Sequence, residues 1–384
     1  MHISETIRYA GVNDHTIDLF EGQYPVPAGM AYNSYVILDE KVAVMDSVEE
    51  GFAGQWFENL DAILDGRQPD YLVVHHMEPD HSGSIAKFME RYPQAVVVSG
   101  AKSFGIMKQF FGTDFSERQM SVKEGTVLEL GTHSLTFIAA PMVHWPEVMM
   151  SYDAADKVLF SADAFGKFGA LDVDEPWVDE ARRYYIGIVG KFGAQVQTVL
   201  KKAAALDIQT ICSLHGPVLT GNLSEYLNYY NTWSTYQPEE QGVAIAYTSV
   251  YGHTKAAVEY LAKKLEERGI RTAVYDLART DLAAAVADAY RFDRLVLATT
   301  TYNAGIYPMM QTYLDHLLSH NFQNRLVAIV ENGSWAPTAA KGMMKMLEGC
   351  KNLSYAENTV TLKGAMSEDS RAKLDALAEE LAER

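Results

Sequence analysis

Short apolar runs separated by turns dominate the first part of the chain. Runs rich in Val, Ile and Tyr at residues 34–38, 42–45, 71–75, 95–99, 135–139 and 157–161 predict β-strands, because β-branched and aromatic side chains favour extended backbone. Longer stretches with helical spacing intervene at 52–64 and 193–206. This mixture predicts two sheets layered with helices.

The pattern changes after residue 242 to a regular alternation of strand and helix. Strand-like runs are found at 243–248, 271–276, 294–299 and 326–330, helical stretches at 253–268 and 282–289, and an amphipathic helix at 367–382. Such alternation predicts a parallel sheet with helices on both faces. The polar, proline-containing segment 235–242 is the expected linker. We therefore expect two domains, 1–241 and 242–384.

Composition fits a globular enzyme, with 384 residues of which 48% are hydrophobic and 21% charged. No apolar run is long enough to cross a bilayer, and the first residues have neither the basic start nor the apolar core of a secretory signal. Two cysteines, Cys212 and Cys350, cannot build a disulfide framework or a four-thiolate iron site. A cytoplasmic location without membrane attachment is the expectation.

The net charge of −18 is unevenly distributed. Residues 1–241 hold 16 Lys and Arg against 33 Asp and Glu, whereas residues 242–384 hold 16 against 17. An acidic surface argues against nucleic acid or anionic lipid as a partner. Solubility accounts for most of the excess, and we expect a few of the carboxylates to be metal ligands.

Ionisable residues are concentrated directly after the predicted strand 71–75. His76, Glu78, Asp80 and His81 fall within six residues. A single histidine is more often a hydrogen-bonded core residue, but this density after an apolar strand would be costly without a cation. Loops at strand ends commonly carry functional residues because the sheet holds them in place.

Three further candidates also follow predicted strands. His144 follows 135–139, Asp163 follows 157–161, and His215 follows the short run 210–212. Seven candidate ligands at strand ends predict a site for two metal ions rather than one.

Three loops of the second part lie where open α/β sheets bind ligands, at the carboxyl ends of parallel strands. The first precedes a helix N-terminus, which suits a phosphate, and it lacks the Gly-x-Gly-x-x-Gly of dinucleotide sites and the lysine of a P-loop, so it favours a mononucleotide. The candidate contacts are Thr248, Ser249, Val250, Tyr251, Gly252, His253 and Thr254 in the first loop, Thr301, Tyr302, Asn303, Ala304 and Gly305 in the second, and Asn332, Gly333, Ser334 and Trp335 in the third.

A strand that ends at Asp46, followed by histidine-rich loops at strand ends, resembles the metallo-β-lactamase superfamily. Its hydrolases carry His-x-His-x-Asp-His, whereas this chain has Glu78 at the second histidine. A carboxylate there adds negative charge and a hard oxygen donor, which favours iron over zinc. The motif 76–81, then His144 after 62 residues and Asp163 after 18 more, resembles the flavodiiron proteins, and the resemblance runs over essentially the whole chain.

The resemblance implies a metallo-β-lactamase-like αββα sandwich followed by a flavodoxin-like doubly wound parallel sheet. It also implies that one iron is held by His76, Glu78 and His144, the other by Asp80 and His215, with Asp163 bridging both. His81 is a ligand in some members of the family and not in others. The three loops resemble those of flavodoxin, where the first holds the FMN phosphate and the other two hold the isoalloxazine ring, with Tyr302 and Trp335 as stacking partners.

The implied activity is the reduction of O2 to water, of NO to N2O, or of both. Two Fe(II) and reduced FMN hold the four electrons that O2 requires. The implied electron donor is external, rubredoxin-like or coenzyme F420, and the implied assembly is a head-to-tail homodimer or a tetramer. Two alternatives stay open: a zinc hydrolase with an accessory flavodoxin domain, and an electron carrier whose first domain is a docking module.

Overall fold

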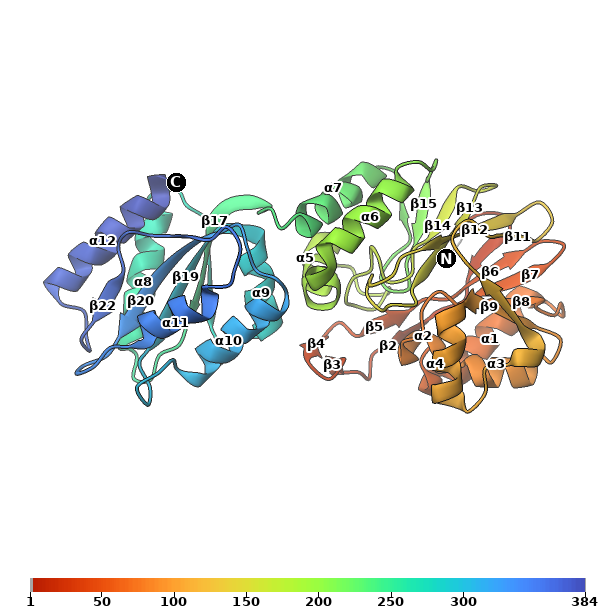
Figure 1. The fold of residues 1–384 in the computed structure, drawn as a ribbon, viewed down its shortest axis with the longest axis horizontal. Coiled ribbons are helices and arrows are strands. Elements are labelled where there is room, and N and C mark those ends of the chain that lie inside the picture. The colour runs from red at the N-terminus through yellow and green to blue at the C-terminus, as the bar shows by residue number, and fades with distance from the viewer. Residues whose placement is uncertain (1–2, 384) are drawn as a thin grey trace. The chain divides into compact units, whose positions relative to one another are not determined.

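The computed structural model describes residues 3–383 of the chain (Figure 1). Contacts between residues divide the chain into two units, 1–231 and 232–384. Among the helices of the described residues, none has the length and apolar character that crossing a bilayer would require.

Unit 1 is built on two six-stranded sheets. The first has the order β1 (Ile7–Tyr9), β6 (Tyr35–Leu38), β7 (Val42–Met45), β8 (Tyr71–Val73), β9 (Val96–Gly100) and β10 (Gln119–Val122). The second has the order β11 (Val127–Glu129), β12 (Ser134–Ala139), β13 (Met149–Asp153), β14 (Val158–Phe160), β15 (Thr210–Cys212) and β16 (Leu219–Thr220). Two small ribbons pair β2 (Val12–Asp14) with β5 (Met30–Tyr32), and β3 (Leu19–Phe20) with β4 (Tyr24–Pro25).

The two sheets pack face to face, because alternate side chains of both form one core. Tyr35 and Val73 of the first sheet and Phe137 and Phe160 of the second belong to this cluster. Helices cover the outer faces (Figure 1): α1 (Ala53–Leu64), α2 (Pro79–Ser82), α3 (Ile85–Arg91) and α4 (Ala101–Phe111) on the side of the first sheet, and α5 (Trp177–Tyr184), α6 (Gly193–Ala203) and α7 (Leu223–Ser234) on the side of the second. Unit 1 is therefore an αββα sandwich, as predicted.

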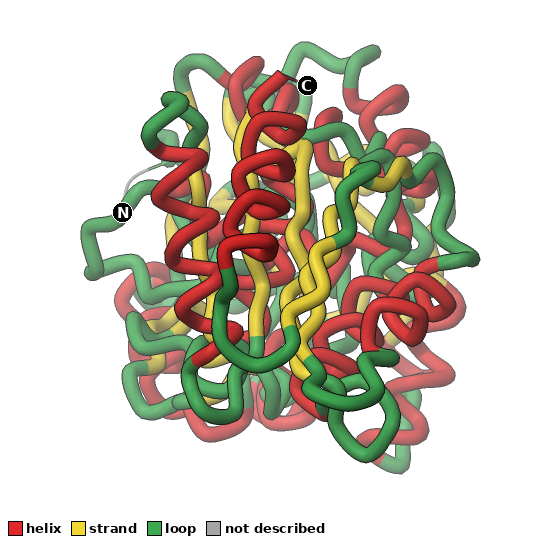
Figure 2. The backbone as a smooth tube through the Cα atoms, turned by 90° about the vertical axis from the view of Figure 1, so that its left-hand side faces the viewer, coloured by secondary structure: helices red, strands yellow, loops and turns green. Residues whose placement is uncertain are grey.

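Unit 2 is one parallel sheet, with the order β18 (Thr272–Asp276), β17 (Glu240–Tyr247), β19 (Phe292–Thr300), β20 (Leu326–Asn332) and β21 (Ser354–Tyr355), and with β22 (Val360–Leu362) also paired to β20. Helices α8 (His253–Glu266) and α12 (Glu368–Glu383) pack with the sheet in one core. The remaining helices are α9 (Leu282–Arg291), α10 (Pro308–Ser319) and α11 (Ala339–Leu347), so helices flank the strands on both sides (Figure 2).

The doubly wound sheet of unit 2 confirms the predicted fold class. The expected strands and helices are present, with ends shifted by a few residues. The linker prediction is wrong at its end, because β17 begins at Glu240, which already pairs with Phe292 of β19. Its polar composition hid this, since Glu240 uses its charge to pair with Arg271 and Arg291, which directly precede the neighbouring strands β18 and β19. The domain division at 241 and 242 stays a prediction.

Candidate functional site

Every predicted metal ligand lies in a loop or short helix directly after a strand of unit 1. His76 and Glu78 follow β8, and Asp80 and His81 lie in α2. The other three follow strands of the second sheet: His144 comes after β12, Asp163 after β14 and His215 after β15. Both sheets thus present side chains at the same edge of the sandwich.

Strained backbone is concentrated in these loops. Four residues that are not glycine have left-handed conformations there, with φ of +56° at Asp46, +65° at Met142, +50° at Ala162 and +68° at Phe165. Such conformations cost free energy for residues that carry a Cβ, and they persist where the surrounding structure enforces them. The fold therefore gives up some stability to hold these loops in the conformations that direct their side chains toward the site.

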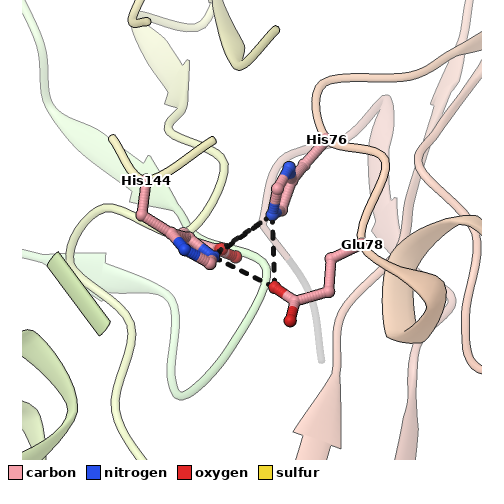
Figure 3. Close-up of side chains that lie close together, drawn as sticks. His76, Glu78 and His144 are labelled. Atoms are coloured by element: carbon pink, nitrogen blue, oxygen red, sulfur yellow. Dashed lines mark hydrogen bonds and ion pairs between the residues drawn. The ribbon is translucent and has the colours of Figure 1, made fainter. Parts of the chain in front are cut away.

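Four side chains form the first group of potential ligands. Figure 3 shows three of them, His76, Glu78 and His144, pointing toward one another. Nε2 of His76 lies 3.3 Å from Nε2 of His144 and 3.3 Å from Oε2 of Glu78, which is 3.0 Å from Nε2 of His144. Oδ2 of Asp163 completes the group, at 3.3 Å from His76 Nε2 and 3.1 Å from His144 Nε2. Four donor atoms at such separations surround a point suited to one metal ion.

Asp80, His81 and His215 form the second group. Nε2 of His81 lies 3.0 Å from Nε2 of His215. Oδ2 of Asp80 lies 3.3 Å from Nε2 of His81 and 3.2 Å from Nε2 of His215. The other oxygen of Asp163, Oδ1, faces this group at 3.3 Å from His81 Nε2 and 3.8 Å from His215 Nε2. Asp163 thus divides its two oxygens between the two groups.

Two hydrogen bonds behind the site fix the tautomers of its histidines. Nδ1 of His76 donates to Oε1 of Glu147 at 2.8 Å, and Nδ1 of His215 donates to the carbonyl oxygen of Ala31 at 2.7 Å. A neutral ring that donates through Nδ1 keeps the lone pair of Nε2 free, which is the arrangement behind most metal-bound histidines. Glu147 was missed in the sequence, although its place three residues after His144 was an available signal.

The loop that carries His76 is also anchored from behind. Asp46, at the end of β7, accepts the backbone N–H of His75 at 2.7 Å with one oxygen and contacts Nδ1 of His75 at 2.6 Å with the other. The other ring nitrogen of His75 lies 2.8 Å from the hydroxyl of Ser151. His75 is therefore a buried structural residue, and its neighbour His76 faces the site.

The residues of the two groups fit a pair of cations. Within residues 3–383, both oxygens of Asp163 and both of Asp80 are buried and accept no hydrogen bond, which would be costly for ionised carboxylates. Three carboxylates and four imidazoles supply hard oxygen and nitrogen donors. Their division into two separate groups of donor atoms suits two ions rather than one.

The same charges perturb the metal-free side chains. Burial alone would lower the pKa of His76, but the charge and close contact of Asp163, together with hydrogen bonds to Glu147 and Glu78, raise it well above the usual value. For His144 too, the close contact with Asp163 and the hydrogen bond to Glu78 outweigh burial and raise the pKa to about 9. Burial would raise the pKa of Asp163, yet the surrounding imidazoles hold it well below the usual range. Without metal, protons on His76 and His144 compensate the carboxylates around them.

Unit 2 has a cavity of about 750 Å³ at the carboxyl ends of β17, β19 and β20. Thirteen of the sixteen predicted nucleotide contacts line it: Ser249, Val250, Tyr251, His253, Thr254, Thr301, Tyr302, Asn303, Ala304, Asn332, Gly333, Ser334 and Trp335. Two aromatic side chains at its rim are almost fully exposed, Tyr251 at 90% and Trp335 at 92%. The size is within the usual range for a bound small molecule.

Three predicted contacts do not line the cavity. The Thr248 hydroxyl is buried against that of Thr299 at 2.6 Å, Gly252 caps α8 with φ of +92°, and Gly305 pairs with the backbone of Tyr302. Thr300, Ala336 and Gly364 line it instead. Gly364 was missed because it follows β22, an edge strand too short to stand out in the sequence; its φ of +98° needs glycine.

Known proteins resemble this chain over both units. A family model described as "ODP family beta lactamase" matches residues 30–216. A nitric oxide reductase of Moorella thermoacetica is 30% identical over 372 residues, which cover 94% of this chain and 92% of that protein.

Two solved structures share the fold. The flavodiiron protein from Giardia intestinalis superposes with a TM-score of 0.93 at 25% identity, over 99% of this chain and 95% of that one. The rubredoxin:oxygen oxidoreductase of Desulfovibrio gigas superposes with a TM-score of 0.92 at 24% identity, over 100% of this chain and 98% of that one. At that lower identity the likeness shows the fold alone.

Fold and site together define a metallo-β-lactamase-like domain with a carboxylate-rich site for two metals, joined to a flavodoxin-like domain. The chain belongs to the flavodiiron protein family. Proteins of this family are oxidoreductases that carry FMN and a non-haem diiron site, and the two sites described above fit both cofactors. The comparisons do not favour the zinc-hydrolase alternative or an electron carrier without catalysis.

Proposed function

We propose that the protein reduces O2 to water, NO to N2O, or both, at a diiron site in unit 1 that receives electrons through FMN bound in unit 2. The observation that carries the proposal is the position of Asp163, whose two oxygens each face one group of potential ligands. A carboxylate shared in this way suits two irons close enough to hold both reacting atoms of O2, or two NO molecules.

One iron is assigned to His76, Glu78 and His144, the other to Asp80 and His215, and the bridge to Asp163. The place of His81 Nε2, within 3.3 Å of Asp80 and Asp163, supports its inclusion as a ligand of the second iron. Glu78 supports iron rather than zinc, because it adds a hard anionic donor to the first group.

The cavity of unit 2 supports FMN as its occupant. The N-terminus of α8 directs backbone N–H groups toward an anion, and the hydroxyls of Ser249 and Thr254 line the same end, so the phosphate is assigned there. The exposed rings of Tyr302 and Trp335 are assigned to the isoalloxazine ring, against which aromatic side chains stack well.

When bound, the irons and the flavin together supply the four electrons that O2 requires, or the two that a pair of NO molecules requires. The protein's own groups hold the ligands in place. Glu147 and the carbonyl of Ala31 orient His76 and His215, and Trp145 packs edge-on against His76 with the ring centroids 5.2 Å apart. The rings of Phe20 and Tyr184 pack around His215 and exclude water from that side.

Electrons are proposed to come from an external donor, rubredoxin-like or coenzyme F420. The active assembly is proposed to be a head-to-tail homodimer or tetramer in which the flavin of one subunit serves the irons of the other. A cytoplasmic location is supported by the two cysteines, Cys212 and Cys350, which are both free thiols.

The test is steady-state consumption of O2 and of NO by anaerobically purified protein, compared at matched donor supply, with iron, zinc and flavin measured on the same sample. We expect about two irons and one FMN per chain, with uptake of at least one of the gases. An Asp163→Asn variant should lose the activity, whereas an Asp172→Asn variant, at a surface carboxylate, should keep it. Two zinc ions together with hydrolysis of thioesters or lactones would overturn the proposal.

A further inference from the structure

A third group of potential ligands lies in unit 1, away from the diiron site. It consists of His133, Asp153 and Asp156, which we call the hairpin cluster, and one ligand atom of each lies within 4.8 Å of the others. His133 precedes β12, whose far end leads to His144, and the turn holding Asp156 precedes β14, whose far end leads to Asp163. The hairpin cluster is therefore at the opposite end of these strands from the irons.

Thr6 connects two members of the hairpin cluster. Its hydroxyl oxygen lies 2.8 Å from Nε2 of His133 and 3.2 Å from Oδ2 of Asp156, a carboxylate oxygen that can only accept. When the hydroxyl proton goes to Asp156, Nε2 of His133 is the donor of the other contact, and Nδ1 of a neutral ring then keeps a lone pair that can bind a metal ion.

Nδ1 of His133 faces a carboxylate, at 3.1 Å from Oδ2 of Asp153. In the tautomer with the proton on Nε2, these two acceptors repel one another unless a positive charge lies with them. A separation of about 3.0–3.4 Å is also that of two neighbouring ligands on a metal with bonds of roughly 2.0–2.2 Å.

A second observation points to a ligand. Asp153 is fully buried, and its oxygen Oδ1 accepts no hydrogen bond from any described residue. Its other oxygen already accepts the backbone N–H of Asp156 at 2.9 Å. A buried carboxylate oxygen without a partner is costly, and a proton on His133 would leave it unpaired.

We propose that the hairpin cluster binds one divalent first-row metal ion through Nδ1 of His133 and the carboxylates of Asp153 and Asp156. One imidazole and two carboxylates are a donor set that such ions accept, and a divalent ion balances the two negative charges. Asp156 is partly exposed, which leaves a route for the ion and a coordination position for water.

The bound ion has a structural role. Thr6 immediately precedes β1 of the first sheet, whereas Asp153 ends β13 of the second sheet and His133 and Asp156 lie in turns next to its strands. Through the hydroxyl of Thr6, the ion connects the two sheets at the end remote from the catalytic irons.

The test is calorimetric titration of iron-loaded full-length protein with Zn²⁺, followed by elemental analysis. We expect one equivalent of zinc per chain with the iron content unchanged. Asp156→Asn and His133→Gln should each weaken zinc binding by at least about tenfold, since even the loss of a group behind a ligand commonly costs 10–100-fold. Asp156→Asn, at a partly exposed position, should fold and retain gas consumption.

The matched control is His15→Gln, at an exposed histidine that pairs with a single carboxylate, Asp172, at 3.0 Å. It should bind zinc as the unaltered protein does. The proposal is overturned if the unaltered protein takes up no saturable zinc beyond its irons, which would identify the hairpin cluster as a buried imidazolium–carboxylate pair. The proposal would also be overturned if Asp156→Asn and His133→Gln bound zinc as tightly as the unaltered protein does.

Discussion

Replacement of Glu147 tests whether the residues that hydrogen-bond to the metal ligands determine how tightly the site binds iron. Oε1 of Glu147 accepts two buried hydrogen bonds, from Nδ1 of His76 at 2.8 Å and from the backbone N–H of Met77 at 3.0 Å. Glu147→Ala leaves both donors buried without a partner, at about 1–3 kcal/mol each, so the free energy of unfolding should fall by about 2–6 kcal/mol.

Iron affinity should fall as well, because His76 loses the bond that fixes its ring and its tautomer. Groups in this position commonly change metal affinity by about 10–100-fold, or roughly 1.4–2.7 kcal/mol. Glu147→Gln keeps an acceptor oxygen of the same shape but loses the charge, so its iron affinity should lie between those of the unaltered protein and Glu147→Ala.

The assay is anaerobic competition for Fe(II) against a coloured chelator, with chemical unfolding measured on the same samples. Glu58→Ala, at an exposed position of α1, is the control and should change neither quantity. An iron affinity within twofold of the unaltered value in Glu147→Ala would refute the reasoning, since the orientation of His76 would then not depend on Glu147.

Three further predictions address the two sites. Glu78→Gln removes one anionic donor, so iron at the first position and gas consumption should both fall by at least tenfold, as measured by elemental analysis and gas electrodes; unchanged iron would exclude Glu78 as a ligand. Trp335→Ala should weaken FMN binding by about 2–10-fold in a fluorescence titration without changing the melting temperature, because the side chain is 92% exposed. In metal-free protein the pKa of His144 is raised to about 9 from about 6.5, so its stabilisation, roughly 3 kcal/mol, is present below pH 6.5 and lost as the pH rises to 9. Thermal melts should show this loss in the metal-free protein and not in the iron-loaded protein; identical pH profiles would contradict the assignment.

The sequence predicted much of the fold because its periodicity is local. The runs that became β7, β12 and β20 are strongly apolar, and their ends are marked by turn residues or by the ligands themselves. The error at Glu240 came from its charge, because a charged residue at the start of a strand can form ion pairs with residues next to the neighbouring strands, here Arg271 and Arg291. Short edge strands such as β22 have too little pattern to be recognised.

The site was predictable as a set of residues but not as a geometry. Spacing after strands identified the seven side chains, yet it could not show that Asp163 divides its oxygens between two groups, because this depends on how the two sheets pack. Glu147 was missed for a similar reason, as its partner His76 lies 71 residues away in the chain. Non-local contacts of this kind leave no periodic signal in one sequence.

The division of the seven side chains between two sheets has a consequence for the order of events in the cell. Glu78 and His76 come from the first sheet, whereas His144 and Asp163 come from the second, so neither sheet alone offers a complete set for an iron. Iron can be captured only after the two halves of unit 1 have docked, which makes metal loading a late step of maturation. A substitution in the shared core, such as Phe137→Ala, should then lower the yield of iron-loaded protein without touching a ligand.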